Sequence, residues 1–132
     1  MEHHLLVRPE HLNQYGFLFG GYLLMWVDET AWIAACLDFP GCRFVTVAMN
    51  RVEFRHNVRS GSLLKLDIRR VRQGVTSVDY KVDVSRAGSE GAAPLGQSGG
   101  AAIGEEIFST TVSFVRVDET GRKLALPMHP TA

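Results

Sequence analysis

Residues 11–35 read HLNQYGFLFGGYLLMWVDETAWIAA, and this stretch decides the fold. From Tyr22 to Leu37 only Asp28, Glu29 and Thr30 interrupt an apolar run that would span about 24 Å as a helix. A helix that is apolar nearly all round belongs inside a protein. A carboxylate in the middle of such a helix is costly to bury, so Asp28 is the first residue to examine for function.

The sequence after Pro40-Gly41, where the helix must stop, changes from helical to alternating periodicity. Long strands are expected over residues 44–54, 63–72, 75–86 and 107–117, with an irregularity near Asn50 and a hairpin turn at Gln73-Gly74. A short strand is expected to begin at residues 5–7. One long central helix wrapped by a curved antiparallel β-sheet, in a single α+β domain over residues 1–132, satisfies this pattern.

Two segments are expected to be irregular. Residues 87–104 are rich in Gly, Ala and Ser and are predicted to form a mobile loop insertion. The tail, residues 124–132, is predicted to be loosely ordered.

The overall composition argues against several classes of protein. The net charge is zero, so the chain has no general attraction to nucleic acid or to a membrane surface. The apolar run is too short and too acidic for a membrane span, and the five histidines lack the spacing of metal ligands. Cys36 and Cys42, with no visible signal peptide, indicate reduced thiols in a cytoplasmic protein.

Positive charge is concentrated in residues 43–72, which hold eight Arg and Lys against two acids. Such a segment suits a small polyanionic ligand, although a solvated strand face is an equally good explanation.

Gly20 and Gly21 begin the helix, where backbone N–H groups lack partners and the helix dipole favours negative charge. A carbonyl placed there would have its developing oxyanion stabilised. The alternative is that the two glycines only permit close packing or a tight turn.

Asp28 lies seven residues after Gly21, which is two helical turns or about 10.5 Å along the same face. That distance is too large for Asp28 to act on a carbonyl at its own helix N-terminus. If both groups serve one reaction, they must come from different chains. Two antiparallel helices packed side by side would create two such sites at a dimer interface.

The motif Asn13-x-x-Gly16-x-x-Phe19-Gly20-Gly21-x-Leu23, followed by Asp28, resembles the signature of hotdog-fold acyl-CoA thioesterases, closest to the cytosolic YciA-like group. The resemblance continues through Val45-Thr46, Arg51-Val52-x-Phe54, Val58-Arg59-x-Gly61, Gly74-x-Thr76-Ser77 and Phe114-Val115-x-Val117-Asp118. It implies a hotdog domain that hydrolyses the thioester of acyl-CoA without a metal or other cofactor.

The resemblance also implies roles for individual residues. Asp28 would be the general base that activates water, or a nucleophile that forms an anhydride, and Asn13 would orient the water or the thioester. The structural alternatives are an Asp28 paired with an arginine and an Asn13 that only satisfies its own backbone. Arg59 is the first choice for a contact to the phosphates of coenzyme A, with Arg55 and Arg72 as weaker choices; Gly74, Thr76 and Ser77 match a turn along the coenzyme.

The expected partners are the acyl-CoA substrate and further copies of the chain, at minimum a homodimer and in larger assemblies a tetramer or hexamer. Two other functions compete with hydrolysis. One is a non-catalytic acyl-CoA sensor with the same fold. The other is a hotdog dehydratase, suggested only by the triplet Phe39-Pro40-Gly41 and opposed by its place after the helix.

Overall fold

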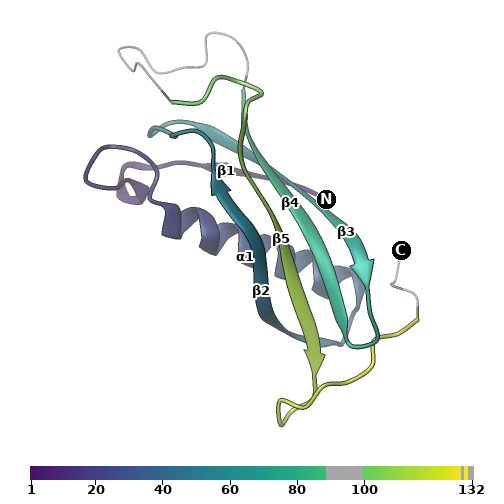
Figure 1. Ribbon diagram of the computed structural model, residues 1–132. Coiled ribbons are helices and arrows are strands. Elements are labelled where there is room, and N and C mark those ends of the chain that lie inside the picture. Colours follow the sequence, from purple (N-terminus) through teal and green to yellow (C-terminus); the bar gives the residue numbers. More distant parts are fainter. Residues whose placement is uncertain (89–99, 129, 131–132) are drawn as a thin grey trace.

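The computed structural model describes residues 1–88, 100–128 and 130. One α-helix lies against one side of a five-stranded sheet (Figure 1). In chain order the elements are β1 (Glu2–Leu6), the 3₁₀ turn η1 (Pro9–His11), α1 (Gly20–Asp38), β2 (Arg43–Phe54), β3 (Leu63–Gln73), β4 (Ser77–Ala87) and β5 (Glu106–Val117). This is the single α+β layer pair expected from the sequence.

The helix α1 ends where its sequence predicts. Its last residue is Asp38, Phe39 caps it, and Gly41 follows with φ 81°, a left-handed conformation that glycine adopts without strain. The triplet that suggested a dehydratase is therefore the stop signal of the helix, and the ring of Phe39 is buried in the core.

Burial of α1 differs from the expectation of an enclosed helix. One face is buried against the sheet by Leu23, Trp26, Val27, Ala31 and their neighbours. The opposite face leaves large apolar side chains exposed within the single chain, namely Met25, Trp32, Ile33 and Leu37. The helix is therefore apolar on nearly every side for two reasons. One face packs on the sheet of its own chain, and the other is an exposed apolar surface of the kind that a partner covers.

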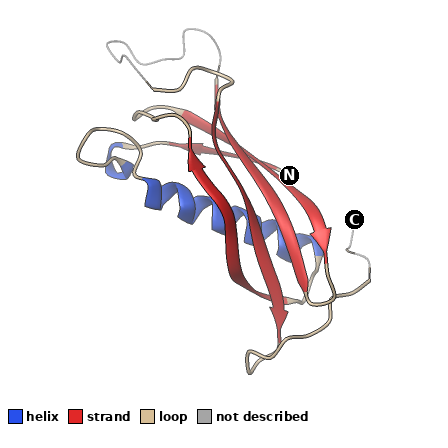
Figure 2. Cartoon of the chain, in the orientation of Figure 1, coloured by secondary structure: helices blue, strands red, loops and turns tan. Residues whose placement is uncertain are grey.

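The sheet has the order β1-β3-β4-β5-β2, and all neighbouring strands are antiparallel (Figure 2). The predicted hairpin is present as β3 and β4, and β4 alternates as expected. The side chains of β4 that face the helix are fully buried, whereas those on the outer face are half-buried. The buried set is Val78, Tyr80, Val82 and Val84. The core lies between this face and α1.

The predicted irregularity in β2 is confirmed. The register of β2 against β5 shifts between Asn50 and Glu53, and Arg51 lies in this interval with φ 61°. A positive φ is a strained conformation for a residue with a side chain. A second shift lies between Thr46 and Ala48.

Three expectations for irregular segments need correction. The first strand was expected at residues 5–7, but it covers Glu2–Leu6, because these five residues pair with β3. Of the predicted mobile loop 87–104, residues 89–99 lie outside the described residues, but Ala101 is buried and its N–H donates to the carbonyl of Asn57. In the tail, Leu126 is buried and donates its N–H to the carbonyl of Val75, whereas residues 129, 131 and 132 lie outside the described residues.

A polar anchor joins the end of α1 to the sheet. The hydroxyl of buried Tyr80 donates to Asp38 Oδ2 at 2.6 Å, and Arg70 Nη1 donates to the same oxygen at 3.2 Å. Burial, followed by the hydrogen bond to Asp38, raises the pKa of Tyr80, so this hydroxyl remains a proton donor.

We expect Tyr80→Phe to lower the free energy of unfolding by about 1–2 kcal/mol, because it removes a hydrogen bond to a charged acceptor without opening a large cavity. Chemical denaturation at fixed protein concentration measures the change. Tyr15→Phe is the matched control, since Tyr15 is 75% exposed. Equal midpoints for the two variants would contradict an anchoring role for the hydroxyl.

Candidate active site

The loop before α1 holds Asn13 by its own backbone. Asn13 Oδ1 accepts hydrogen bonds from the N–H groups of Tyr15 (2.9 Å) and Phe17 (3.1 Å), and Gly16 takes φ 83° in the turn. This is the structural alternative raised for Asn13. The same bonds fix the orientation of the amide, whose NH₂ group makes no hydrogen bond within the described part of the chain.

The helix N-terminus is open to a ligand. Phe19 caps α1 without a side-chain hydrogen bond, and no acidic residue stands in the first turn. Within the described residues the N–H groups of Gly20 and Gly21 have no acceptor, whereas those of Tyr22 and Leu23 donate to the carbonyl of Phe19. Two free donors at the positive end of a helix dipole suit a carbonyl oxygen that gains negative charge.

An apolar cavity of about 220 Å³ adjoins Gly20. A Cβ atom added at Gly20 would lie 3.0 Å from the ring of Phe54, so the glycine allows this ring to approach the helix. The cavity is lined by Leu18, Gly20, Leu23, Phe54, His56, Asn57, Val58 and Ile107. A mainly apolar space beside free N–H donors is suited to the apolar part of an ester or thioester.

Asp28 is half-buried in the single chain, on the part of α1 that the sheet does not fully cover. Its Oδ1 accepts a hydrogen bond of 2.6 Å from the hydroxyl of Thr46 on β2. The suggested arginine partner is absent, because no ion pair to Asp28 exists within the described residues. Sequence reasoning did not single out Thr46 as a site residue, although Val45-Thr46 belongs to the matched pattern.

A single chain does not bring Asp28 to the helix N-terminus. Both lie on the continuous helix α1, with Asp28 two turns or about 10.5 Å beyond Gly21. The surface around Asp28 is apolar and uncovered, with Met25 and Trp32 on the helix and Val45 and Val47 on the neighbouring edge strand β2 all 43–57% exposed. This surface has the composition of a face that a second chain covers.

The bond from Thr46 orients the Asp28 carboxylate, so we expect Thr46→Val to lower kcat for thioester hydrolysis by about 10-fold with little change in KM. Thr30→Val is the matched control, because the Thr30 hydroxyl bonds only carbonyls of its own helix, those of Trp26 and Val27. Thiol release under saturating substrate measures both variants. Equal losses in the two would mean that Thr46 has no specific part in the reaction.

Arg59 lies beside the Asn13 loop. Its guanidinium carbon is 4.7 Å from the centre of the Phe17 ring, and its Nε is buried without a hydrogen-bond partner. Arg55 is instead held by two acids, Glu106 at 2.7 Å and Glu53 at 3.9 Å. Arg59 therefore stays the better candidate of the two for an anionic group.

The turn formed by Gly74, Thr76 and Ser77 lies at the opposite end of the sheet. Gly74 donates its N–H to the carbonyl of Ser77, and Ser77 pairs with Val115 near the end of β5. The strand β4 separates this turn from the Arg59 end by about 33 Å. These residues and Arg59 cannot contact one ligand within a single chain in this arrangement, and a shared site would again need two chains.

Other expectations concern absences. Within residues 1–88, 100–128 and 130, no group of three or more His, Cys, Asp and Glu side chains is placed to hold a metal ion. No helix among the described residues has the length and hydropathy needed to cross a membrane. Cys36 and Cys42 are both free thiols, and burial, with a smaller contribution from Cys42, raises the pKa of Cys36.

The fold and site define an α+β protein with free N–H donors at the start of its one long helix and a carboxylate two turns further on. Residues 15–93 match the family model of the thioesterase superfamily. The chain belongs to this superfamily, and its fold is the hotdog fold.

Individual relatives agree with this assignment. The acyl-CoA thioester hydrolase YciA of Escherichia coli (strain K12) is 32% identical over 125 residues, which cover 93% of this chain and 87% of YciA. Acyl-coenzyme A thioesterase 11 of Mus musculus is 33% identical over 79 residues, but these cover 60% of this chain and only 13% of that longer protein. A solved hexameric hotdog fold thioesterase of Campylobacter jejuni has a TM-score of 0.77 at 26% identity, covering 95% of this chain and 88% of that one.

Proposed function

We propose that this protein hydrolyses acyl-CoA to a free carboxylic acid and coenzyme A, at a site that two chains build together. The observation that carries the proposal is the placement of Asp28. It is hydrogen-bonded to Thr46, lies on an uncovered apolar surface, and stands two turns from free N–H donors that it cannot serve in its own chain.

In the proposed site, Gly20 and Gly21 of one chain face Asp28 of the other. The thioester carbonyl oxygen would accept the two free N–H groups, and its substituents would enter the apolar cavity beside Gly20. The Asn13 amide, already oriented by the loop, would hold the attacking water or the thioester.

The reaction then needs one proton acceptor. Asp28 acting as general base takes a proton from water while the water oxygen bonds to the carbonyl carbon. The tetrahedral oxyanion collapses, the C–S bond breaks, and the thiolate of coenzyme A leaves and takes the proton from Asp28, which regenerates the base. Asp28 acting as nucleophile would first form an anhydride, which water hydrolyses to the same products. We predict that neither route needs a metal ion or a cofactor.

The coenzyme half of the substrate is strongly anionic, and most of its proposed contacts are cationic or hydroxyl groups. Arg59 is the first of these, because its guanidinium lies close to the Asn13 loop and has no acidic partner within the described residues. Arg55, Gly74, Thr76 and Ser77 stay in the proposal as weaker contacts, the last three through a neighbouring chain.

The assembly that we propose is a homodimer at minimum and a hexamer of three such dimers. The uncovered apolar face of α1 and the open edge of β2 support the dimer. The hexameric state of the Campylobacter jejuni thioesterase supports the larger form. Light scattering after size-exclusion chromatography decides between dimer, tetramer and hexamer. The free thiols of Cys36 and Cys42 support the proposed cytoplasmic location.

A thiol-release assay over acyl-CoA substrates of increasing chain length tests the function. We expect release of one thiol per acid formed, with the strongest activity on chains that the apolar cavity accommodates. Saturable binding of the same acyl-CoA substrates without any thiol release would instead identify a sensor. The two outcomes are exclusive for any substrate that binds.

A further inference from the structure

The bulge in β2 is a strained feature that the proposed reaction does not use. Between Asn50 and Glu53 the strand β2 has two residues where β5 has only Thr110. Arg51 is one of the two, and it is the only residue other than glycine with positive φ in the described part of the chain. The hydroxyl of Thr110 donates to the Asn50 carbonyl at 2.9 Å, which satisfies a group that the bulge removes from the ladder. Retained strain of this kind often accompanies a function, and bulges re-aim side chains.

Polar side chains form two parallel rows on the outer face of the sheet beside this bulge. Residues directly opposite each other in a sheet point to the same side, so Asn50, Thr111 and Lys81 make one row. Glu53, Ser109 and Asp83 make the next. The rows lie on the side away from α1, and the inward residues between them are buried.

A small polar pocket of about 150 Å³ lies at the bulge. Its lining consists of Asn50, Arg51, Glu53, Arg55, Lys81, Ser109, Thr110 and Thr111. Three cationic side chains line this space, and the one acidic side chain in the lining is Glu53. The hydroxyls of Ser109 and Thr110 donate to Asp83 and to the Asn50 carbonyl, whereas the Thr111 hydroxyl forms no hydrogen bond within the described residues. The lining therefore offers mainly hydrogen-bond donors.

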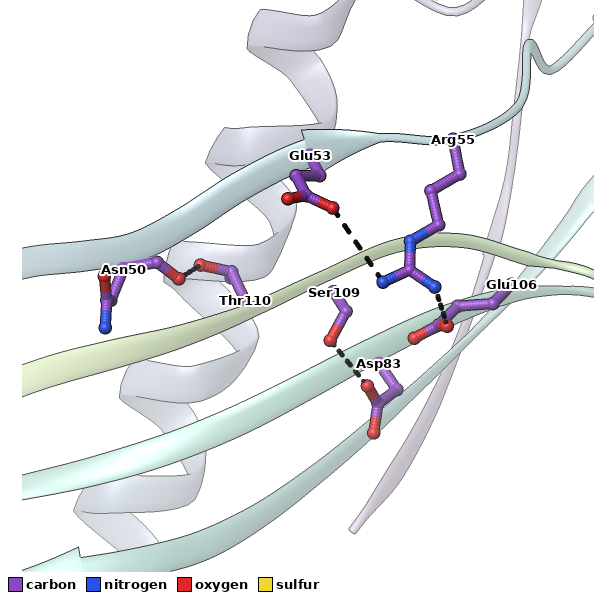
Figure 3. Close-up of polar contacts among 7 residues, drawn as sticks. All are labelled: Asn50, Glu53, Arg55, Asp83, Glu106, Ser109 and Thr110. Atoms are coloured by element: carbon purple, nitrogen blue, oxygen red, sulfur yellow. Dashed lines mark hydrogen bonds and ion pairs between the residues drawn. The ribbon is translucent and has the colours of Figure 1, made fainter.

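The acids around the pocket already have partners. Figure 3 shows Arg55 between Glu53 and Glu106, with the shorter contact of 2.7 Å to Glu106. It also shows Asp83 accepting a hydrogen bond from Ser109, at 2.8 Å. Arg51 and Lys81, by contrast, form no ion pair within the described residues. These two cations and the Thr111 hydroxyl line the same pocket, and their hydrogen-bond donors match the oxygens of a tetrahedral anion.

We propose that this outer-face pocket binds a phosphate group, held by Arg51, Lys81 and the hydroxyl of Thr111. The bulge places the Arg51 side chain at the pocket on the outer face. In a regular strand Arg51, which follows the outward-facing Asn50, would point to the opposite face of the sheet. The phosphate has two possible sources: a phosphate of coenzyme A that reaches the pocket from a site at the sheet edge, or free phosphate. The first source rests on the proposed function and the second does not.

Two variants test the site in the full-length protein. Arg51→Gly removes the guanidinium and suits the positive φ, so the variant should unfold at the same temperature as the wild type or at a higher one. Lys81→Gln removes the second cation. Arg122→Gln is the matched control, since Arg122 is an exposed arginine in the turn after β5.

Calorimetric titration with inorganic phosphate, coenzyme A and dephospho-coenzyme A gives the affinities. We expect Arg51→Gly and Lys81→Gln each to weaken phosphate binding about tenfold or more, and Arg122→Gln to leave it unchanged. Tighter binding of coenzyme A than of its dephospho form, with that preference lost in Arg51→Gly, identifies the substrate as the source. Loss of inorganic phosphate binding in Arg51→Gly, with the affinity for both coenzymes unchanged from the wild type, identifies free phosphate.

The proposal is overturned if the pocket binds no phosphate group. In that case each of the three ligands would have the same affinity for the wild type, Arg51→Gly, Lys81→Gln and Arg122→Gln. It is also overturned if Arg51→Gly changes only the oligomeric state. These readouts need no turnover, so absence of thioesterase activity would leave the phosphate test in force.

Discussion

Asp28→Asn is expected to lower kcat for acyl-CoA hydrolysis by about 10²–10⁴-fold, the range that a positioned general base contributes. The substitution keeps the Oδ1 oxygen that accepts the Thr46 hydroxyl, so the local structure should persist. What it removes is the group that takes a proton from water. Thiol release and the temperature of unfolding, measured on the same preparation, separate loss of chemistry from loss of fold.

The matched control for this prediction is Glu29→Gln. Glu29 is the next carboxylate on α1, but its side chain is exposed and turned about 100° around the helix from Asp28. It should retain nearly the full rate. A wild-type rate in Asp28→Asn, or an equal loss in Glu29→Gln, would exclude Asp28 as the base or nucleophile.

Local sequence signals predicted the main elements well because their causes are local. The two glycines at the start of α1 and the Phe39-Pro40-Gly41 stop determine the ends of the helix. Alternation between apolar and polar residues determines β4, since opposite faces of one strand meet the core and the outer surface. The helix N-terminus was predictable for the same reason, since free N–H groups are a property of any helix start.

Contacts between distant segments were not predictable. Thr46 meets Asp28 only because β2 lies beside α1, and no pattern within either segment indicates the pair. Ala101 was assigned to a loose segment because its neighbours are small, and Leu126 because it lies near the end of the chain. Each is buried, and each donates its backbone N–H to a carbonyl far away in the chain, at Asn57 and Val75. The composition of a segment indicates how much apolar surface it can bury, but not which distant segments it contacts in the folded chain.

The helix illustrates a further limit. Its sequence is apolar on nearly every side, which predicts burial but not the chain that provides it. The structure divides α1 into a face buried by its own sheet and a face with exposed Met25, Trp32 and Ile33. The acid at position 28 lies near the border of these two faces. Whether Asp28 is catalytic therefore depends on how two chains assemble, and a mixture of two inactive variants can test this.

Mixing Asp28→Asn with Asn13→Asp is expected to restore activity that neither variant has alone. Asn13→Asp keeps the Oδ1 acceptor for the N–H groups of Tyr15 and Phe17 but replaces the amide donor by a negative charge near the oxyanion position. Each homodimer then has a defect in both of its sites. Each mixed dimer has one site with both defects and one site with none.

Co-expression of the two variants with different affinity tags, followed by tandem purification, isolates the mixed assemblies. Without that selection, random pairing makes half of the dimers mixed, so the recovered rate should be about a quarter of the wild-type rate. If Asp28 and Asn13 of the same chain formed one site, every site in every dimer would carry one defect and no activity would return. Recovery therefore measures the one feature that the single chain can only imply: Asp28 works on a substrate bound at another chain's helix N-terminus.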